Sequence, residues 1–451
     1  MSPGRVAEPD APAAPVHKAL RPAYMGYALG LLCLTQAFNI GDRMVIGIVQ
    51  EPIKLEFGLS DFQLGLLGGP AFAILYSLMT IPIARIADRA NRIAIVSIAL
   101  GVWSALTATC GLASSYVQLL MARIGISMGE AGAAAPSLSY ISDLFPPARR
   151  GTAMAIFAIG GPLGALMATV IGGRIAQDHG WRATFLCFGA AGLIAALLIR
   201  LTLREVRHAG ERRDTVSFGA ALRALSGRRS YIHVCMGGVF AGFCANFITQ
   251  YMASFLIRVH ALSLAEASLV VGLASGVFGM IGAFSGGYLS DRIARKRPGR
   301  RTIVVAVAFA IAAFAYAGAF WAPLGVALPL LMLASMCMNT YPGVSYAVAS
   351  EVASPAMRAT AIAIFTLAGN LLGYALGPPT LGAISDMVAG WEATRLGLDP
   401  ARCVAEPLFA LCVQSRGFGL RTALSIAGLL FLGGSLHYGL ASRSLERDLV
   451  D

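Results

Sequence analysis

The sequence of 451 residues contains little charge, because Asp, Glu, Lys and Arg make up only 13% of it. Soluble proteins contain about 25% charged residues. Hydrophobic residues make up 57% of the chain, and its mean hydropathy is +0.70. So much apolar side chain does not fit inside water-soluble cores. The composition therefore excludes an ordinary soluble enzyme, a disordered chain and a nucleic-acid-binding domain, and it indicates a polytopic membrane protein.

Motifs of several enzyme and metal-site classes are also absent from the sequence. The eight cysteines have no Cys-x-x-Cys or other metal-ligand spacing. The sequence contains neither the His-Glu-x-x-His motif of metalloproteases nor the Gly-x-x-x-x-Gly-Lys-Ser/Thr loop that binds ATP. We therefore expect no enzyme activity, no metal and no cofactor. Residues 1–22 lack the apolar core of a signal peptide and are expected to form a disordered tail.

Apolar segments of about 20–30 residues recur along the chain, and each is long enough to cross a bilayer as a helix. They predict an all-α membrane protein with twelve transmembrane helices. The predicted helices lie near 25–50, 60–86, 92–113, 115–143, 151–177, 181–203, 230–257, 263–290, 301–321, 325–350, 357–388 and 418–442.

The net charge of +12 is distributed unevenly among the predicted loops. Twelve helices place both termini on one side of the membrane. That side carries 25 of the 35 Lys and Arg residues and the opposite side carries 8, while Arg43 and Arg123 lie inside helices. Basic residues collect in cytoplasmic loops, so we predict that both termini are cytoplasmic.

The largest charged loop, residues 204–229, divides the chain into two halves. We predict six-helix bundles over 23–203 and 230–444, with a short cytoplasmic tail at 445–451.

The two halves also repeat short motifs at similar offsets. Arg150-Gly-Thr-Ala-Met-Ala-Ile-Phe157 corresponds to Arg358-Ala-Thr-Ala-Ile-Ala-Ile-Phe365, and Ala84-x-x-x-Asp88-Arg89 corresponds to Gly287-x-x-x-Asp291-Arg292. Two parallel, pseudo-symmetric bundles are typical of transporters that work by alternating access.

Four motifs resemble the signatures of the major facilitator superfamily. They are Asp88-Arg89-Ala-Asn91-Arg92, Arg123-Ile-Gly125-Ile-Ser-Met-Gly129-Glu130-Ala131, Gly160-Gly161-Pro162-Leu-Gly164 and Gly180-Trp181-Arg182. The resemblance covers nearly the whole chain. In the first motif, Ala84 and Asn91 stand where glycines are usual.

Within that superfamily, the sequence is most similar to bacterial members of the Spinster family. The resemblance rests on Asn39-Ile-Gly-Asp42-Arg43, on Met128-Gly129-Glu130-Ala131 and on Ile141-Ser-Asp143-Leu-Phe145. It implies transport of sphingosine phosphate and other lysolipids, with proton coupling in some members. Organic-anion:proton symporters carry similar motifs, so a small organic anion remains the alternative substrate.

Four ionisable residues are expected inside the membrane, where charges are costly and usually functional. Asp42 and Arg43 lie on the first helix, and Arg123 and Glu130 share one face of the fourth helix, two turns apart. We interpret Arg43 as the ligand of an anionic headgroup, Asp42 and Glu130 as proton carriers, and Arg123 as the partner that tunes Glu130. The alternative is a structural ion-pair cluster that ties the two helices together.

The C-terminal half offers no comparable buried charge, so its predicted contribution to the site is polar. Asn339, Tyr341 and Asn370 are the candidate substrate ligands there. Asn246, Thr249, Gln250 and Thr340 are weaker candidates, and all seven residues also suit hydrogen bonds between helices.

Five charged residues at the ends of helices are predicted to gate the transporter: Asp88, Arg89, Arg92, Asp291 and Arg292. Asp88 is expected to face the N-terminal end of the eleventh helix, near 354–358, and to hold the cytoplasmic side shut. The alternative is a solvated charged turn.

A long outer loop at 389–417 contains Cys403 and Cys412, nine residues apart, and we expect a disulfide between them. Its apolar stretch 407–413 is expected to lie along the membrane surface.

Together these patterns predict a monomeric, proton-coupled secondary transporter in a bacterial plasma membrane. A channel would not need paired motifs at both cytoplasmic hinges. A membrane sensor, the alternative outside transport, would usually carry a soluble output domain, and no segment has the composition of one.

Overall fold

The computed structural model describes residues 21–87, 90–206, 218–354, 357–405 and 409–449. These residues form helices and their connections, and no strand occurs in the ranges described. Most of the predicted tail, residues 1–20, and part of the predicted linker, residues 207–217, lie outside them.

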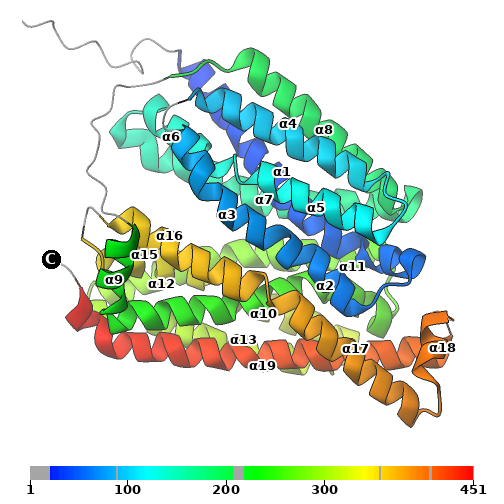
Figure 1. Cartoon of the computed structure of the whole chain (residues 1–451). Coiled ribbons are helices and arrows are strands. Elements are labelled where there is room, and N and C mark those ends of the chain that lie inside the picture. The colour runs from blue at the N-terminus through cyan, green and yellow to red at the C-terminus, as the bar shows by residue number, and fades with distance from the viewer. Residues whose placement is uncertain (1–20, 88–89, 207–217, 355–356, 406–408, 450–451) are drawn as a thin grey trace, which may run out of the picture.

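The helices are arranged as two bundles that lie side by side (Figure 1). The first bundle contains α1 (Pro22–Phe57), α2 (Asp61–Gly68), α3 (Pro70–Ala87), α4 (Arg92–Cys110), α5 (Tyr116–Glu130), α6 (Ala134–Leu144), α7 (Pro147–His179) and α8 (Trp181–Thr202). The short helix α9 (Phe218–Ser226) precedes the second bundle. The second bundle contains α10 (Arg229–His260), α11 (Leu264–Gly272), η2 (Leu273–Phe278), α12 (Gly279–Ala294), η3 (Pro298–Arg300), α13 (Ile303–Ala319), α14 (Leu324–Met338), α15 (Tyr341–Glu351), α16 (Arg358–Ala368), η4 (Gly369–Tyr374), α17 (Gly377–Arg395), α18 (Pro400–Ala405) and α19 (Ala410–Asp448).

Eleven helical segments in the described residues are long and apolar enough to cross a membrane. A further segment, Tyr116–Leu144, is divided into α5 and α6 by a short turn after Glu130, and is consistent with the twelfth predicted span. Large apolar side chains on the outside of the bundles, such as Leu201 and Phe284, are 73% and 78% exposed. Such a surface requires lipid rather than water around it.

Glycine allows α1 and α7 to approach closely in the first bundle. A Cβ atom at Gly160 would clash with the carbonyl oxygen of Cys33, and one at Gly164 would clash with that of Ala37. Association of membrane helices depends on such packing of small residues.

We therefore expect Gly164→Ala to destabilise the first bundle by about 1–3 kcal/mol, the usual cost of overpacking. The measurement is the thermal unfolding of the purified protein in detergent. Gly151→Ala is the matched control on the same helix, because a Cβ at Gly151 meets no atom within 4 Å. An equal melting temperature for the two variants would contradict this interpretation of the α1–α7 contact.

The two ends of the molecule differ in how the bundles meet. The terminal face, which carries the start of α1 and the end of α19, contains one ion-pair cluster within each bundle. The opposite face carries α2, α11 and α17, and there α2 packs on α17 while α7 packs on α11, across the two bundles (Figure 1).

The clusters of the terminal face repeat the pseudo-symmetry of the sequence. Arg92 pairs with Asp143 at 2.7 Å and with Glu205 at 2.7 Å. Arg301 pairs with Asp291 at 3.0 Å and with Glu351. Each bundle therefore ties the terminal ends of its own helices together, and these ion pairs do not cross between bundles.

Candidate functional site

Arg43 on α1 forms an ion pair with Glu130, the last residue of α5. The Arg43 Nε atom lies 2.9 Å from Glu130 Oε2. Asn39, one turn earlier on α1, accepts a hydrogen bond from Arg43 Nη2 at 3.0 Å and donates one to Glu130 Oε2 at 3.2 Å. The side chain of Glu130 is 0% exposed, whereas that of Arg43 is 17% exposed. The pair therefore has a sealed acidic end and an accessible basic end.

Two aromatic rings of α3 hold the Arg43 guanidinium group. Its central carbon lies 4.4 Å from the ring centroid of Phe72 and 4.5 Å from that of Tyr76. The negative faces of the rings stabilise the cation, and they orient a planar donor that suits carboxylate or phosphate groups.

Asp42 and Arg123 lie beside this pair and are both buried inside the first bundle. Asp42 is 3% exposed, and its Oδ2 atom accepts a hydrogen bond from Thr107 at 3.2 Å. Arg123 is 1% exposed and donates from Nη1 to the backbone carbonyl of Asp42 at 3.3 Å. Sequence reasoning brought these four charges together and paired Arg123 with Glu130. In the structure the direct partner of Glu130 is Arg43.

One oxygen of each buried carboxylate lacks a hydrogen-bond partner in the described structure. These atoms are Asp42 Oδ1 and Glu130 Oε1. Burying a charged oxygen without a partner is costly. A proton added to either atom would break none of the hydrogen bonds that the carboxylate already makes.

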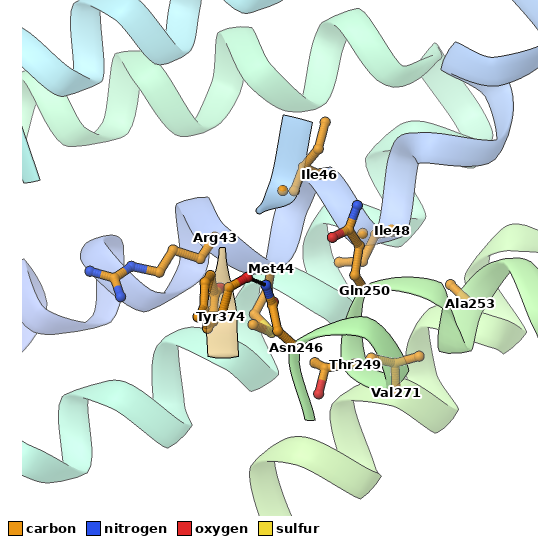
Figure 2. Close-up of a pocket in the computed structure, with 12 residues that line it drawn as sticks. Arg43, Met44, Ile46, Ile48, Asn246, Thr249, Gln250, Ala253, Val271 and Tyr374 are labelled. Carbon is orange, nitrogen blue, oxygen red and sulfur yellow. Dashed lines mark hydrogen bonds between the residues drawn. The ribbon is translucent and has the colours of Figure 1, made fainter. Parts of the chain in front are cut away.

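Arg43 lines a small pocket between the two bundles (Figure 2). The pocket volume is about 20 Å³, which is close to the space of one water molecule. Its other lining residues are Met44, Ile46, Gly47, Ile48, Gly68, Asn246, Thr249, Gln250, Ala253, Val271 and Tyr374. The first bundle thus contributes the charge, and the second contributes mainly neutral polar and apolar groups.

Three polar residues of α10, Asn246, Thr249 and Gln250, form the second-bundle wall of this pocket together with Tyr374 of η4. Asn246 donates a hydrogen bond to the backbone carbonyl of Tyr374 at 2.8 Å (Figure 2). That carbonyl needs an external donor because the residue four positions later, Pro378, has no N–H group. Asn246 therefore stabilises the break in the eleventh span, while Gln250 reaches across to the carbonyl of Leu64 at 2.9 Å.

The three preferred candidates of the second bundle do not line this pocket. Asn339 donates to the Ser335 carbonyl at 2.9 Å, one turn back on its own helix. Tyr341 packs against Phe309 with ring centroids 5.9 Å apart. Asn370 lies in the π-helical segment η4. The weaker candidates Asn246, Thr249 and Gln250 occupy the wall instead.

The predicted gating residues have different environments. Asp88 and Arg89 lie outside the described residues. Arg92 is 3% exposed and belongs to the first terminal-face cluster, and Asp291 belongs to the second. Arg292 is exposed on the same face.

Sequence reasoning missed a buried ion network on the opposite face. Asp61 of α2 pairs with Lys54 and with Arg258 of α10, whose Nη2 atom lies 2.9 Å from Asp61 Oδ1. Arg258 also pairs with Glu51 at 2.8 Å, and its side chain is only 4% exposed. The prediction that the C-terminal half lacks buried charge is therefore wrong.

The network is missed because Lys54 and Arg258 lie near helix ends and were counted as solvated loop charges. Further hydrogen bonds extend it to α17, where Ser385 Oγ lies 2.7 Å from Asp61 Oδ2. Asp386 accepts from the backbone N–H groups of Asp61 and Phe62, each at 2.8 Å. One carboxylate, Asp61, thus connects α1, α2, α10 and α17.

Cys403 and Cys412 are joined by a disulfide, with Cα atoms 5.1 Å apart. The segment around them differs from the predicted loop at 389–417, because α17 continues to Arg395 and α19 begins at Ala410. Residues 410–413 of the predicted surface stretch form the first turn of α19, and 406–408 lie outside the described residues.

Comparison with known proteins identifies the family. Residues 32–378 match the family model described as Major Facilitator Superfamily. The fold is similar to a solved bacterial homolog of the human lysosomal transporter Spinster, in an inward-facing and unoccupied conformation. That protein is 31% identical, with a TM-score of 0.86 over 96% of this chain and 100% of the other.

The chain is also similar to curated transporters whose names describe different transport functions. An "MFS-type efflux pump" of Mycolicibacterium smegmatis is 29% identical over 94% of both chains. The "Hexuronate transporter" of Bacillus subtilis is 26% identical, over 81% of this chain and 89% of the relative. The "Sphingosine-1-phosphate transporter SPNS2" of Danio rerio is 25% identical, over 81% and 77%. The twin bundles, the helix motifs and these matches together show that the chain belongs to the major facilitator superfamily of transporters and, within it, to the Spinster family.

Proposed function

We propose that this transporter moves an anionic amphiphile, such as a lysolipid phosphate, in exchange or in symport with protons. The observation that carries the proposal is the accessible Arg43, which is stacked on two aromatic rings and paired with a sealed carboxylate. A guanidinium group binds phosphate through two parallel hydrogen bonds. Met44, Ile48 and Val271, which line the same pocket, suit the apolar part of an amphiphile.

Proton coupling would follow from competition for Arg43. While the site is empty, Glu130 neutralises the cation. When Glu130 takes up a proton at Oε1, it loses its charge and holds Arg43 less strongly, so an anionic headgroup can displace it from the guanidinium group. Asp42 is a second proton carrier, because it is also buried and also has an oxygen without a hydrogen-bond partner.

The direction of opening would follow from the charge distribution of the sequence. If the terminal face is cytoplasmic, as the excess of basic residues there indicates, the network around Asp61 closes the outer face. The conformation is then inward-facing, in a plasma membrane with both termini in the cytoplasm. The similarity to a Spinster homolog solved in an inward-facing conformation supports the assignment of this conformation.

A small organic anion is the second candidate substrate. Similarity to the hexuronate transporter favours it, and so does the polar wall formed by Asn246, Thr249 and Gln250. A carboxylate could bind Arg43 as a phosphate does, with sugar hydroxyl groups on these three side chains.

Transport by the purified protein in liposomes distinguishes these candidates. Sphingosine phosphate and glucuronate are offered separately, each with and without an imposed pH gradient, and protein-free liposomes serve as the control. We expect protein-dependent movement of the lysolipid phosphate that is accelerated by the gradient. Movement of glucuronate without movement of the lysolipid would contradict the proposal and favour the second candidate.

A further inference from the structure

The loop between α12 and α13 is the most basic segment in the described part of the chain. Residues 292–301 read Arg-Ile-Ala-Arg-Lys-Arg-Pro-Gly-Arg-Arg. Six of these ten residues are Arg or Lys and carry a positive charge. The loop lies on the terminal face, and none of its residues lines the Arg43 pocket. We call residues 292–301 the basic loop.

The basic loop is longer than its counterpart in the first bundle. Asp88 and Asp291 are 203 residues apart, whereas Arg92 and Arg301 are 209 residues apart. Arg92 and Arg301 have the same role, because each pairs with an acidic residue of the same bundle, Asp143 or Glu351. The extra residues of the basic loop, and the charges they carry, are therefore not needed for the ion pairs that the two bundles share.

Five cations of the basic loop have no acidic partner in the described residues. Arg301 alone in this loop forms ion pairs, with Asp291 and Glu351. The remaining five are exposed and take part in none of the ion pairs found in the described ranges: Arg292, Arg295, Lys296, Arg297 and Arg300. Such a concentration of unpaired charge repels itself, so an anion bound among these side chains would stabilise it.

The loop has a defined shape rather than an extended one. The 3₁₀ turn η3 fixes it, and Gly299 packs against Glu446 of α19, where a Cβ atom would lie 2.9 Å from Glu446 Cβ. A pocket of about 530 Å³ is formed by four cations and three apolar side chains. They are Arg292, Lys296, Arg297 and Arg300, with Leu289, Ile293 and Ile303.

The position of this pocket indicates which anion it takes. It lies where two membrane spans, Leu264–Ala294 and Pro298–Ala319, meet. On α12, Tyr288 lies six residues before the end of the helix and is 58% exposed, and Phe284, one turn earlier, is 78% exposed. Tyrosine is enriched at the level of lipid headgroups. Clusters of Lys and Arg next to membrane helices, with basic pockets between the helices, bind anionic lipids.

We propose that the pocket of the basic loop binds the headgroup of an anionic phospholipid of the surrounding membrane. The lipid phosphate is held by Arg292, Lys296, Arg297 and Arg300, and the start of an acyl chain lies on Leu289 and Ile293. This lipid is a resident ligand of the bilayer, separate from the substrate that we propose for Arg43. Its binding does not depend on the direction or the chemistry of transport.

Native mass spectrometry of the full-length protein with mixed lipids tests the proposal. The purified protein is equilibrated with phosphatidylglycerol and phosphatidylcholine, and the lipids that it retains are counted. We expect phosphatidylglycerol to be retained in preference. Each removed cation weakens such binding by about fivefold, so a variant with Gln at 292, 296, 297 and 300 should lose the preference by more than about tenfold.

A matched variant separates the pocket from net charge. Replacing Arg149, Arg223, Arg229 and Arg447 by Gln removes the same charge from scattered, exposed sites of the terminal face, and we expect it to retain phosphatidylglycerol. Arg43→Gln should also retain it, which distinguishes the resident lipid from the transported substrate. If the fourfold loop variant does not insert into membranes, Lys296→Gln with Arg297→Gln should give an intermediate loss.

Three results would overturn the proposal. Equal loss in the loop and scattered variants would mean that net charge alone attracts the lipid. Unchanged retention in the loop variant would mean that the basic loop serves only to set topology. Binding of an acidic peptide or a nucleic acid by the basic loop, without any preference for phosphatidylglycerol, would assign the pocket to a different partner.

Discussion

Replacing Glu130 by Gln is expected to abolish the acceleration of transport by a pH gradient. Glutamine has the shape of a protonated glutamate but cannot release a proton. In this variant Arg43 loses its ionic partner, and the guanidinium group stays available to the anionic substrate at every pH. Substrate exchange across the membrane, which requires no net proton movement, should continue.

The measurement compares exchange and gradient-driven transport in the same liposomes. Glu56→Gln is the matched control, because Glu56 pairs with Arg182 near the opposite face and both side chains are well exposed. This control should respond to the gradient as the unmodified protein does. Retention of the gradient response by Glu130→Gln would assign proton coupling to another group, and Asp42→Asn would then be the variant to compare.

Arg43→Gln should affect transport differently from Glu130→Gln, so the two variants together test the separate roles of the two residues. It removes the ligand for the anion, so both exchange and gradient-driven transport should stop. It also leaves Glu130 buried without its cation, which in an ion pair of this kind costs about 3–5 kcal/mol. The exchange assay therefore distinguishes the two variants, because exchange should continue in Glu130→Gln and stop in Arg43→Gln.

Sequence periodicity and charge were sufficient to predict most of the fold. Long apolar runs specify membrane helices directly, because every backbone polar group in the bilayer must be hydrogen-bonded and a helix achieves this within one segment. The predicted span at 92–113 corresponds to α4, Arg92–Cys110, and that at 181–203 corresponds to α8, Trp181–Thr202. The intramembrane charges Arg43 and Glu130 were predictable because few charged residues occur in such runs.

The missed features are contacts between residues more than 100 positions apart, which no local pattern encodes. Asp61 and Arg258 each lie near the end of a helix, and in the sequence they cannot be distinguished from solvated charges. The π-helical segments η2 and η4 likewise lie against the other bundle, because η2 packs on α7 and Phe72 of α3 contacts Tyr374 of η4. Asn246 looked like one polar residue among several, although its role is set by the missing N–H group of Pro378.

Asp61→Asn is expected to open the opposite face of the transporter. The substitution removes the one negative charge that pairs with both Lys54 and Arg258, so Arg258 keeps only Glu51 and Lys54 loses its ion pair. Removing one member of a buried ion network costs about 3–5 kcal/mol. The substitution destabilises the conformation in which the two bundles meet at this face, because Asp61 belongs to the first bundle and Arg258 to the second.

Labelling of Ala253→Cys with a membrane-impermeant maleimide from the outer side measures the opening. Ala253 lines the pocket and is 2% exposed, so it is protected while the face is closed. A shift of about 1.4 kcal/mol changes a population tenfold, and we expect Asp61→Asn to raise the labelling rate by at least about that factor.

Asp178→Asn is the matched control for this experiment. It makes the same chemical change and removes an ion pair, that of Arg174 and Asp178 at 2.8 Å, which lies on a single helix, α7. It should leave the labelling rate unchanged, because no contact between the bundles is lost. Equal labelling in the Asp61 and Asp178 variants would contradict the role of Asp61. That result would indicate that uncharged contacts keep this face closed. One such contact joins α1 and α10, where Gln50 Nε2 donates a hydrogen bond to the backbone carbonyl of Gln250 at 2.9 Å.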